Sequence, residues 1–458
     1  MSRQIRHGQS HASLLRDVSA AGVPQTRSRL DAIVVPAARP SSALQDVISL
    51  SATLSVPLVV LCSRQAHIEQ VAQRVEKTFG ARALIVEVDE RDQLLDVALL
   101  TSDRGFRDAC ADRSSDLSVK RNIGLLLGRL QGWSKILFID DDISHFRPSD
   151  IERLTGYLDR HAVASMVSRH FPDNSVVCHA RRLAGLQQDV FVSGAVLGVN
   201  LHYPKLSFFP DIYNEDWFFF ARNAAERSLP KIGEVRQAKY PPFADPGRAD
   251  REEFGDLLAE GLYALFEYRP GWDFKEQLRA AALVSYWEHF KELRLRMIRE
   301  TDEALSGVQL TADPANYLKT LQAQESLRFA EKRATGISAD LCVDFLDKWQ
   351  EDEVRWQQVL RRYKTVLSER DALAELGLTK WISCGYGVKS MSSGTYTAAE
   401  PEPDLTSPGA VEQGLDLTRG VKAQVVVDPA CLDVVVQNPD EPDLDPRLPV
   451  GQVLQDRA

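Results

Sequence analysis

The chain of 458 residues lacks several features that would place it in a familiar protein class. No run of 18 apolar residues occurs, so the sequence predicts no membrane span. Its six cysteines form no CxxC pair and no Cys/His zinc spacing, which fits reduced, packed thiols. GxSxG, Walker A and GxGxxG patterns are missing, which argues against the simplest hydrolase, NTPase and dinucleotide-binding interpretations. Without an apolar leader of secretory type, we expect a cytoplasmic protein.

An excess of basic charge is also lacking. The net charge is −10, and from Thr397 onward there are 12 acidic residues against 4 basic ones, which leaves the rest of the chain near neutral. This balance predicts no nucleic-acid partner. After Lys389 the composition shifts to Ser, Pro, Gly and Asp, so we expect an acidic, largely disordered tail over residues 391–458.

Apolar strands alternate with amphipathic helices in the first half of the chain. The predicted strands are 32–35, 56–63, 81–90, 135–139, 191–200 and 231–240, and the predicted helices between the first four are 41–54, 67–79 and 116–133. This alternation indicates an α/β fold with a mostly parallel sheet and helices on both faces. In such open sheets, ligands bind at the edge formed by the carboxyl ends of the strands.

The pattern divides the chain into four parts. Residues 1–28 are polar and predict a flexible leader, 29–250 form the α/β domain, 251–390 are helical in pattern, and 391–458 form the tail. The helical region offers a surface for an acceptor site or for homo-oligomerisation.

Three aspartates end the fourth strand, in KILFIDDD (135–142). Buried like charges are costly unless they are paired or bound to a metal. Alternation along an extended chain puts Asp140 and Asp142 on one side, where two carboxylates suit Mn²⁺ or Mg²⁺, and turns Asp141 the other way. The alternative is a solvated acidic turn.

A second acidic pair stands in NEDWFFF, before an aromatic run. Asp216, next to the aromatic residues, is the preferred general base, and Glu215 is the alternative. The competing interpretation is that both acids simply stabilise the amino end of a helix.

Three further positions suit contacts with phosphate or nucleotide. Lys120, Arg121 and Asn122 begin the helix that leads into the aspartate strand, although a solvated helix start would have the same composition. Arg39 follows the first strand, at the binding edge. His179 and His202 flank the glycine-containing segment GAVLG and are candidates to complete a metal site, although a lone histidine is more often structural.

Taken together, AIVVPAARP, KRNIGLLLGRLQGWSKILFIDDDI, GAVLG and NEDW resemble the GT-A glycosyltransferases, closest to family 2, over roughly residues 30–245. The resemblance implies a GT-A fold, a nucleotide-sugar donor, an unknown hydroxyl acceptor and hexosyltransferase-like activity. It places Asp140 and Asp142 as the DXD ligands of Mn²⁺ or Mg²⁺, with Asp141 between them. It assigns the acceptor base to Asp216 or Glu215, which predicts inversion. Nucleoside contacts fall in the loop containing Pro36 and Arg39, and on Asp89.

The sequence also departs from this family pattern. A QxxRW motif is missing, which argues against a processive polysaccharide synthase. Some retaining GT-A enzymes place a downstream histidine on the metal, and His179 or His202 would fill that role. A nucleotidyltransferase is a further alternative, although PAARP lacks its glycines. An inactive GT-A scaffold is the last, although Asp140, Asp142 and Asp216 are intact.

Overall fold

The computed structural model describes residues 6–27, 29–88, 98–171, 174–307, 314–363, 366–385 and 388–392. These residues form one 11-stranded mixed sheet in the order β1-β9-β7-β8-β5-β2-β3-β4-β10-β11, with β6 paired to β9. The strands are β1 (Leu15–Asp17), β2 (Ala32–Ala37), β3 (Leu58–Cys62), β4 (Arg82–Glu87), β5 (Lys135–Ile139), β6 (Ile143–Ser144), β7 (Val163–Arg169), β8 (Val196–Asn200), β9 (Leu229–Gln237), β10 (Trp381–Gly385) and β11 (Val388–Ser392).

Helices surround this sheet and continue beyond it. The α-helices are α1 (Gln45–Leu54), α2 (Ile68–Lys77), α3 (Arg104–Ala109), α4 (Leu117–Leu130), α5 (Pro148–Tyr157), α6 (Val176–Leu183), α7 (Glu215–Phe219), α8 (Ala221–Ala225), α9 (Gly247–Tyr268), α10 (Phe274–Ala281), α11 (Val284–Gly307), α12 (Pro314–Gly336), α13 (Ala339–Arg362) and α14 (Glu369–Glu375). Three short 3-10 helices are η1 (Ala12–Leu14), η2 (Ser41–Leu44) and η3 (Leu100–Ser102). Within the described ranges, no helix combines the length and the apolarity needed to cross a bilayer.

The centre of the sheet is parallel. Strands β4, β3, β2 and β5 run in one direction, with Val34 of β2 opposite both Val59 of β3 and Phe138 of β5. Strand β8 lies antiparallel between β5 and β7, and β9 is parallel to β7. The α/β fold predicted from the alternating pattern is confirmed.

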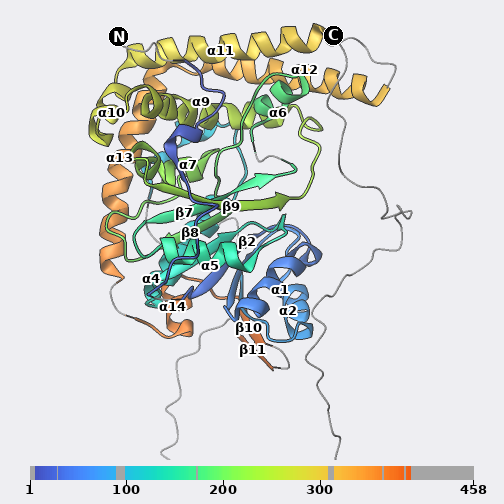
Figure 1. Cartoon of the computed structure of the whole chain (residues 1–458), viewed down its shortest axis with the longest axis vertical. Coiled ribbons are helices and arrows are strands. Elements are labelled where there is room, and N and C mark those ends of the chain that lie inside the picture. Colours follow the sequence, from blue (N-terminus) through green and yellow to red (C-terminus); the bar gives the residue numbers. More distant parts are fainter. Residues whose placement is uncertain are drawn as a thin grey trace, which may run out of the picture. The chain divides into compact units, whose positions relative to one another are not determined.

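Alternating side chains give the sheet two apolar faces. On β2, Ala32 and Val34 pack with α4 and the helical region, whereas Ile33 and Val35 pack with α1 and α2. Figure 1 shows the corresponding layers, with α1 and α2 beside β2, and with α9, α11 and α12 gathered at the other end of the molecule. Burial on both faces explains why these strands are continuous apolar runs.

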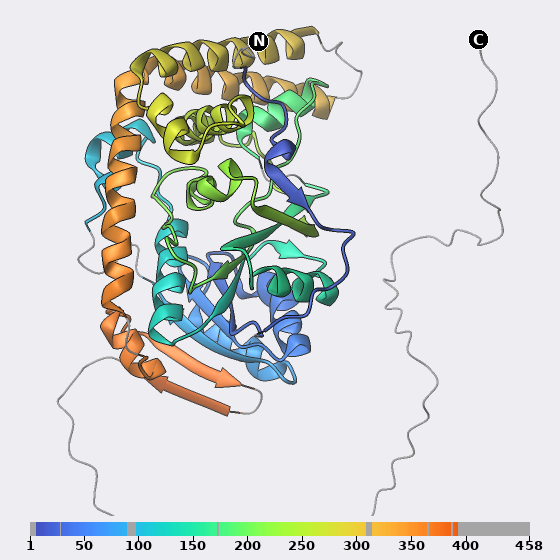
Figure 2. The same cartoon turned by 60° about the vertical axis from the view of Figure 1, so that its left-hand side comes forward.

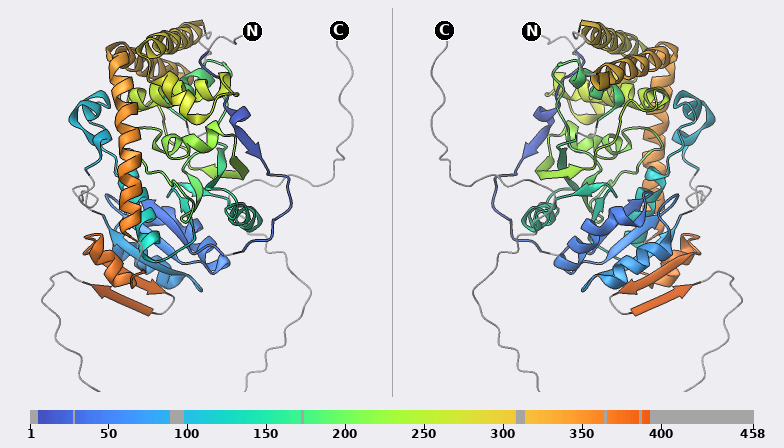
Figure 3. Two further views of the ribbon diagram at one scale, coloured as in Figure 1. Left: turned by 90° about the vertical axis from the view of Figure 1, so that its left-hand side faces the viewer. Right: turned by 90° about the vertical axis from the view of Figure 1, so that its right-hand side faces the viewer.

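The helical region is confirmed from α9 to the end of α14 at Glu375, and α13 attaches it to the α/β part. The prediction of helix up to residue 390 was wrong, because residues 381–385 and 388–392 form β10 and β11. Figures 2 and 3 show α13 running along one side of the molecule, from α11 and α12 toward β10. Asp352 of α13 is fully buried and accepts hydrogen bonds from the amides of Leu100 (2.9 Å) and Thr101 (2.8 Å). The chain then re-enters the sheet, because Ile382 and Cys384 of β10 alternate into the core opposite β4.

Part of the predicted leader also joins the fold. Residues 15–17 form β1, which pairs in parallel with β9, and Leu14 is fully buried. Three paired residues flanked by the buried side chains of Leu14 and Val18 are too short a pattern to mark a strand in the sequence. Of the predicted tail, residues 393–458 lie outside the described residues.

Candidate functional site

The candidate site lies where the order of strands reverses. After β2 the chain continues to β3 on one side, while β5 pairs with β2 on the other. The carboxyl ends of β2 and β5 therefore open at a topological switch point, the usual position of a ligand site in such sheets. A cleft of about 420 Å³ lies there. The predicted site residues that line it are Pro36, Arg39, Lys120, Arg121, Asp140, Asp141, Asp142, Glu215 and Asp216.

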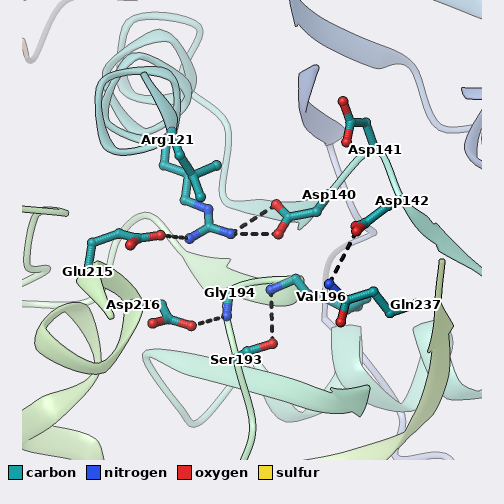
Figure 4. A network of polar contacts seen from close by, with 12 residues as sticks. Arg121, Asp140, Asp141, Asp142, Ser193, Gly194, Val196, Glu215, Asp216 and Gln237 are labelled. Carbon is teal, nitrogen blue, oxygen red and sulfur yellow. Dashed lines mark hydrogen bonds and ion pairs between the residues drawn. The ribbon is translucent and has the colours of Figure 1, made fainter. Parts of the chain in front are cut away.

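Arg121 of α4 connects the two acidic motifs (Figure 4). Its Nη2 donates to both carboxylate oxygens of Asp140 (2.9 and 3.0 Å), and its Nη1 donates to Glu215 (2.6 Å). The guanidinium also lies 5.5 Å from the ring centroid of Phe209. Burial alone would lower the pKa of Arg121, but Asp140 and Glu215 outweigh it and raise the pKa above its ordinary value.

The space for this guanidinium comes from Gly194, in the loop before β8. A Cβ at that position would lie 2.6 Å from Cζ of Arg121 and 2.7 Å from its Nη2. Carbon atoms normally approach to about 3.5–4.0 Å. A side chain at residue 194 would therefore displace the arginine, which explains the glycine in the GAVLG segment.

The three aspartates have three different environments. Strand β5 ends at Ile139, so the alternation expected to extend to Asp142 stops short of it. Asp140 faces Arg121, whereas Asp141 accepts the backbone N–H groups of Ala38 (2.7 Å) and Arg39 (2.8 Å). Asp142 accepts from the Arg39 guanidinium (2.9 Å) and from the side-chain amide of Gln237 (3.2 Å). The Arg39 guanidinium also contacts Asp141, so it bridges two aspartates at once.

Whether these carboxylates suit a divalent cation depends on their present partners. Both Asp140 oxygens face Arg121, which is 2% exposed and fixed by Glu215. Among the described residues, no group of three or more His, Cys, Asp or Glu side chains is arranged to hold a metal ion. Asp142 differs, because its partner Arg39 is 46% exposed and so is less enclosed than Arg121. Mg²⁺ commonly uses one or two carboxylates together with phosphate oxygens and water, so Asp142 fits such a site best.

The second acidic pair begins α7. Asn214, just before it, has a left-handed backbone (φ 62°), and its side-chain amide donates to Asp256 of α9 (3.0 Å). Asp216 accepts the backbone N–H groups of Gly194 (2.5 Å) and Trp217 (2.9 Å). Glu215 and Asp216 are both buried and both line the cleft, but Glu215 is held by Arg121.

Lys120 and Asn122, predicted to contact the donor, mainly support the walls of the cleft. The Nζ of Lys120 donates to the carbonyl of Ala37 (2.8 Å) and to Ser63 (2.6 Å) at the ends of β2 and β3. Burial lowers the pKa of Lys120. Asn122 pairs through both ends of its amide with the backbone of Phe209 and does not line the cleft.

The remaining predicted residues are elsewhere. His202 follows β8 at the end opposite Asp140, roughly 16 Å away for five residues of strand, so it cannot share a metal site with the aspartates. His179 of α6 stacks on Phe171 and shares a hydrogen bond with Tyr240 (3.1 Å), and burial lowers its pKa to about 3. His179 does not line the cleft. Asp89 lies outside the described residues.

Sequence reasoning missed the floor of the cleft, where the N-terminal segment packs on α9. His11 pairs with Glu260 (2.8 Å), a cleft residue, and packs edge-on against Trp217 with ring centroids 5.4 Å apart. Burial alone would lower the pKa of His11, but Glu260 and Glu267 raise it to about 10. His11 and Glu260 are 249 positions apart in the sequence, so no local signal marks this pair.

Comparisons with known proteins add little to this geometry. No model of a known protein family matches the chain, and no curated protein matches its sequence. Among solved structures, it is similar to a mannosyltransferase from Pyrobaculum calidifontis in complex with GDP-Man and Mn²⁺. The identity is 11%, the match covers 73% of this chain and 90% of that chain, and the TM-score is 0.34. A likeness this distant assigns no role to any residue.

Proposed function

We propose that the protein is a GT-A glycosyltransferase that moves a hexose-like sugar from a nucleotide-sugar donor to an acceptor hydroxyl. The observation that carries the proposal is that one cleft contains both acidic motifs of the family pattern. In that cleft Arg121 bonds Asp140 of the first motif and Glu215 of the second. A solvated acidic turn and a simple helix-end pair would not require a shared buried arginine.

The donor diphosphate would lie beside Asp142. Three arginines from separate loops, Arg39, Arg64 and Arg113, line the cleft with it. Guanidinium groups match phosphate oxygens in geometry and charge. When the donor binds, its phosphates would replace Asp142 as the partner of Arg39. Asp142 would then be free to hold Mn²⁺ or Mg²⁺ together with those phosphates, and the cation would supply charge stabilisation for the leaving diphosphate.

Asp216 would serve as the base. The N–H groups of Gly194 and Trp217 fix its carboxylate at the cleft wall. As the acceptor hydroxyl attacks the anomeric carbon, its proton passes to Asp216 and the carbon–oxygen bond to the diphosphate breaks. Attack from the face opposite the leaving group inverts the anomeric centre. Glu215, paired with Arg121, would position the arginine and would take no proton.

The test separates binding from chemistry. Asp216→Asn keeps the shape of the side chain and one of the two oxygens that accept these N–H groups, and Asp216 lies apart from the diphosphate position beside Asp142, so donor affinity should stay within about twofold. Release of nucleoside diphosphate with water as the acceptor should fall roughly 10²–10⁴-fold, the usual contribution of a general base. Asp46→Asn, the same change at an exposed position on α1, should leave both unchanged. Unchanged turnover in Asp216→Asn would remove this residue from the base role.

A further inference from the structure

A second cavity, of about 320 Å³, lies behind the helix that carries the proposed base. Glu215, Asp216 and Trp217 line the cleft, whereas Phe218 and Phe219 of the same helix line the second cavity. No lining residue is common to the two cavities. The volume of the second cavity is within the range of small-molecule sites, about 300–1,000 Å³.

The interior of the second cavity is aromatic and includes one hydrogen-bond donor that has no acceptor among the described residues. Phe218, Phe219, Phe274 and Trp349 all line it and are all buried. The indole Nε1 of Trp349 is buried and has no hydrogen-bond partner among the described residues. A buried N–H left unpaired is unfavourable, so a ligand that accepts a hydrogen bond from it would gain affinity.

The rim of the second cavity has surplus positive charge. Lys205 and Lys275 are exposed and form no ion pair within the described ranges. Cζ of Arg222 lies 4.5 Å from the ring centroid of Phe274. Arg222 also forms a long ion pair with Glu226, with 3.8 Å between Nη1 and the carboxylate oxygen. The remaining acid, Glu353, is half-buried and accepts a hydrogen bond from Ser207, and desolvation raises the pKa of its carboxyl to about 7. Near pH 7, Glu353 is therefore only about half ionised and offsets only part of the cationic charge.

From this combination we infer that the second cavity is a binding site for a small amphipathic anion, a compact apolar or aromatic body bearing one carboxylate, phosphate or sulfonate group. The body would fill the aromatic interior beside Trp349. The charged group would sit at the rim, within reach of Lys205, Lys275 and Arg222. A ligand there would pack against the rear of α7. It would also touch Phe219, which stacks on Phe209 at 4.1 Å beneath the Arg121 guanidinium.

The test uses the full chain and two probes with the same aromatic body. Calorimetric titration with naphthalene-2-sulfonate should show one saturable site, and the uncharged 2-naphthylmethanol should bind about tenfold more weakly or worse. The double variant Lys205→Glu/Lys275→Glu should weaken sulfonate binding by about tenfold, as expected for two exposed charges reversed together. Lys319→Glu, the same change at an exposed position of α12 outside the cavity, should have no effect.

Two more measurements locate the probe. Leu278→Trp adds bulk at the half-buried wall of the second cavity and should abolish binding, while its thermal unfolding shows whether the fold is kept. UDP-, GDP- and dTDP-sugars, which would occupy the cleft, should not displace the probe. No saturation up to about 1 mM, equal affinity for the two probes, or displacement by a nucleotide sugar would each overturn the inference. Saturation and probe selectivity do not involve the donor, and displacement by a nucleotide sugar would show that the protein binds this sugar while removing the probe from the second cavity, so the two proposals fail separately.

Discussion

Replacing Gly194 by alanine perturbs the centre of the site with one methyl group. The new Cβ would lie 2.6 Å from Cζ of Arg121, about 1 Å inside normal carbon contact. A guanidinium is the end of a flexible side chain, but here it can retreat only by leaving Asp140 and Glu215. Overpacking typically costs about 1–3 kcal/mol and loss of a partner from a buried ion pair about 3–5 kcal/mol. Because Arg121 remains present and the Asp140 side chain is 20% exposed, we expect a loss of about 2–3 kcal/mol of unfolding free energy.

Urea unfolding of matched variants measures this loss. Gly105→Ala in α3 is the control, because a Cβ there meets nothing within 4 Å and alanine stabilises a helix by roughly 0.5–1 kcal/mol over glycine. If the clash with the guanidinium is the cause, adding Gly194→Ala to Arg121→Met should cost far less than it does in the wild type. A Gly194→Ala variant as stable as the wild type, or full additivity with Arg121→Met, would refute this explanation.

Three other changes have distinct expected results. Gly255→Ala places a Cβ 2.8 Å from the carbonyl carbon of Tyr213, which is backbone and cannot swing aside, so urea unfolding should show a loss of at least about 2 kcal/mol. His11→Gln should remove a pH-dependent stabilisation. The pKa of His11 is raised from 6.5 to about 10, so that stabilisation is complete below pH 6.5 and is lost as the pH rises toward 10. Urea unfolding should therefore show a larger difference in unfolding free energy between wild type and variant at pH 6 than at pH 10. Arg39→Gln removes the cation that pairs with two buried aspartates, so it should lower the free energy of unfolding by about 1–3 kcal/mol. It should also weaken donor binding at least about tenfold by calorimetry, and unchanged affinity would remove Arg39 from the donor site.

The parts of the fold that the sequence predicted are those with a strong local pattern. Continuous apolar runs marked β2, β3 and β5, and the order of strands and helices placed their carboxyl ends at one edge. Strand β7 escaped prediction because its run includes two buried serines, Ser165 and Ser168, whose burial depends on neighbours distant in sequence. Strand β10 escaped because five residues after a helical region are too few to show a period.

The sequence predicted which residues belong to the site but not which side chains pair with one another. The carboxylates at 140–142 stood out because they follow an apolar run, and those at 215–216 stood out because they precede an aromatic run. Their pairing through Arg121 could not be foreseen, since this arginine and Glu215 are 94 positions apart in the sequence. The same holds for Asp142, where alternation beyond the strand end suggested a shared ligand position with Asp140. The turn instead gave the two aspartates different arginine partners.

The central claim is that the cleft binds a nucleotide-sugar donor with the help of a divalent cation on Asp142. Calorimetric titration of UDP-, GDP- and dTDP-sugars, with and without Mn²⁺, tests it most directly on the wild type and on Asp142→Asn. The account predicts that at least one donor binds the wild type, that Mn²⁺ strengthens this binding at least about tenfold, and that Asp142→Asn loses the Mn²⁺ effect. Failure of every donor to bind the wild type, or an undiminished Mn²⁺ effect in Asp142→Asn, would contradict it.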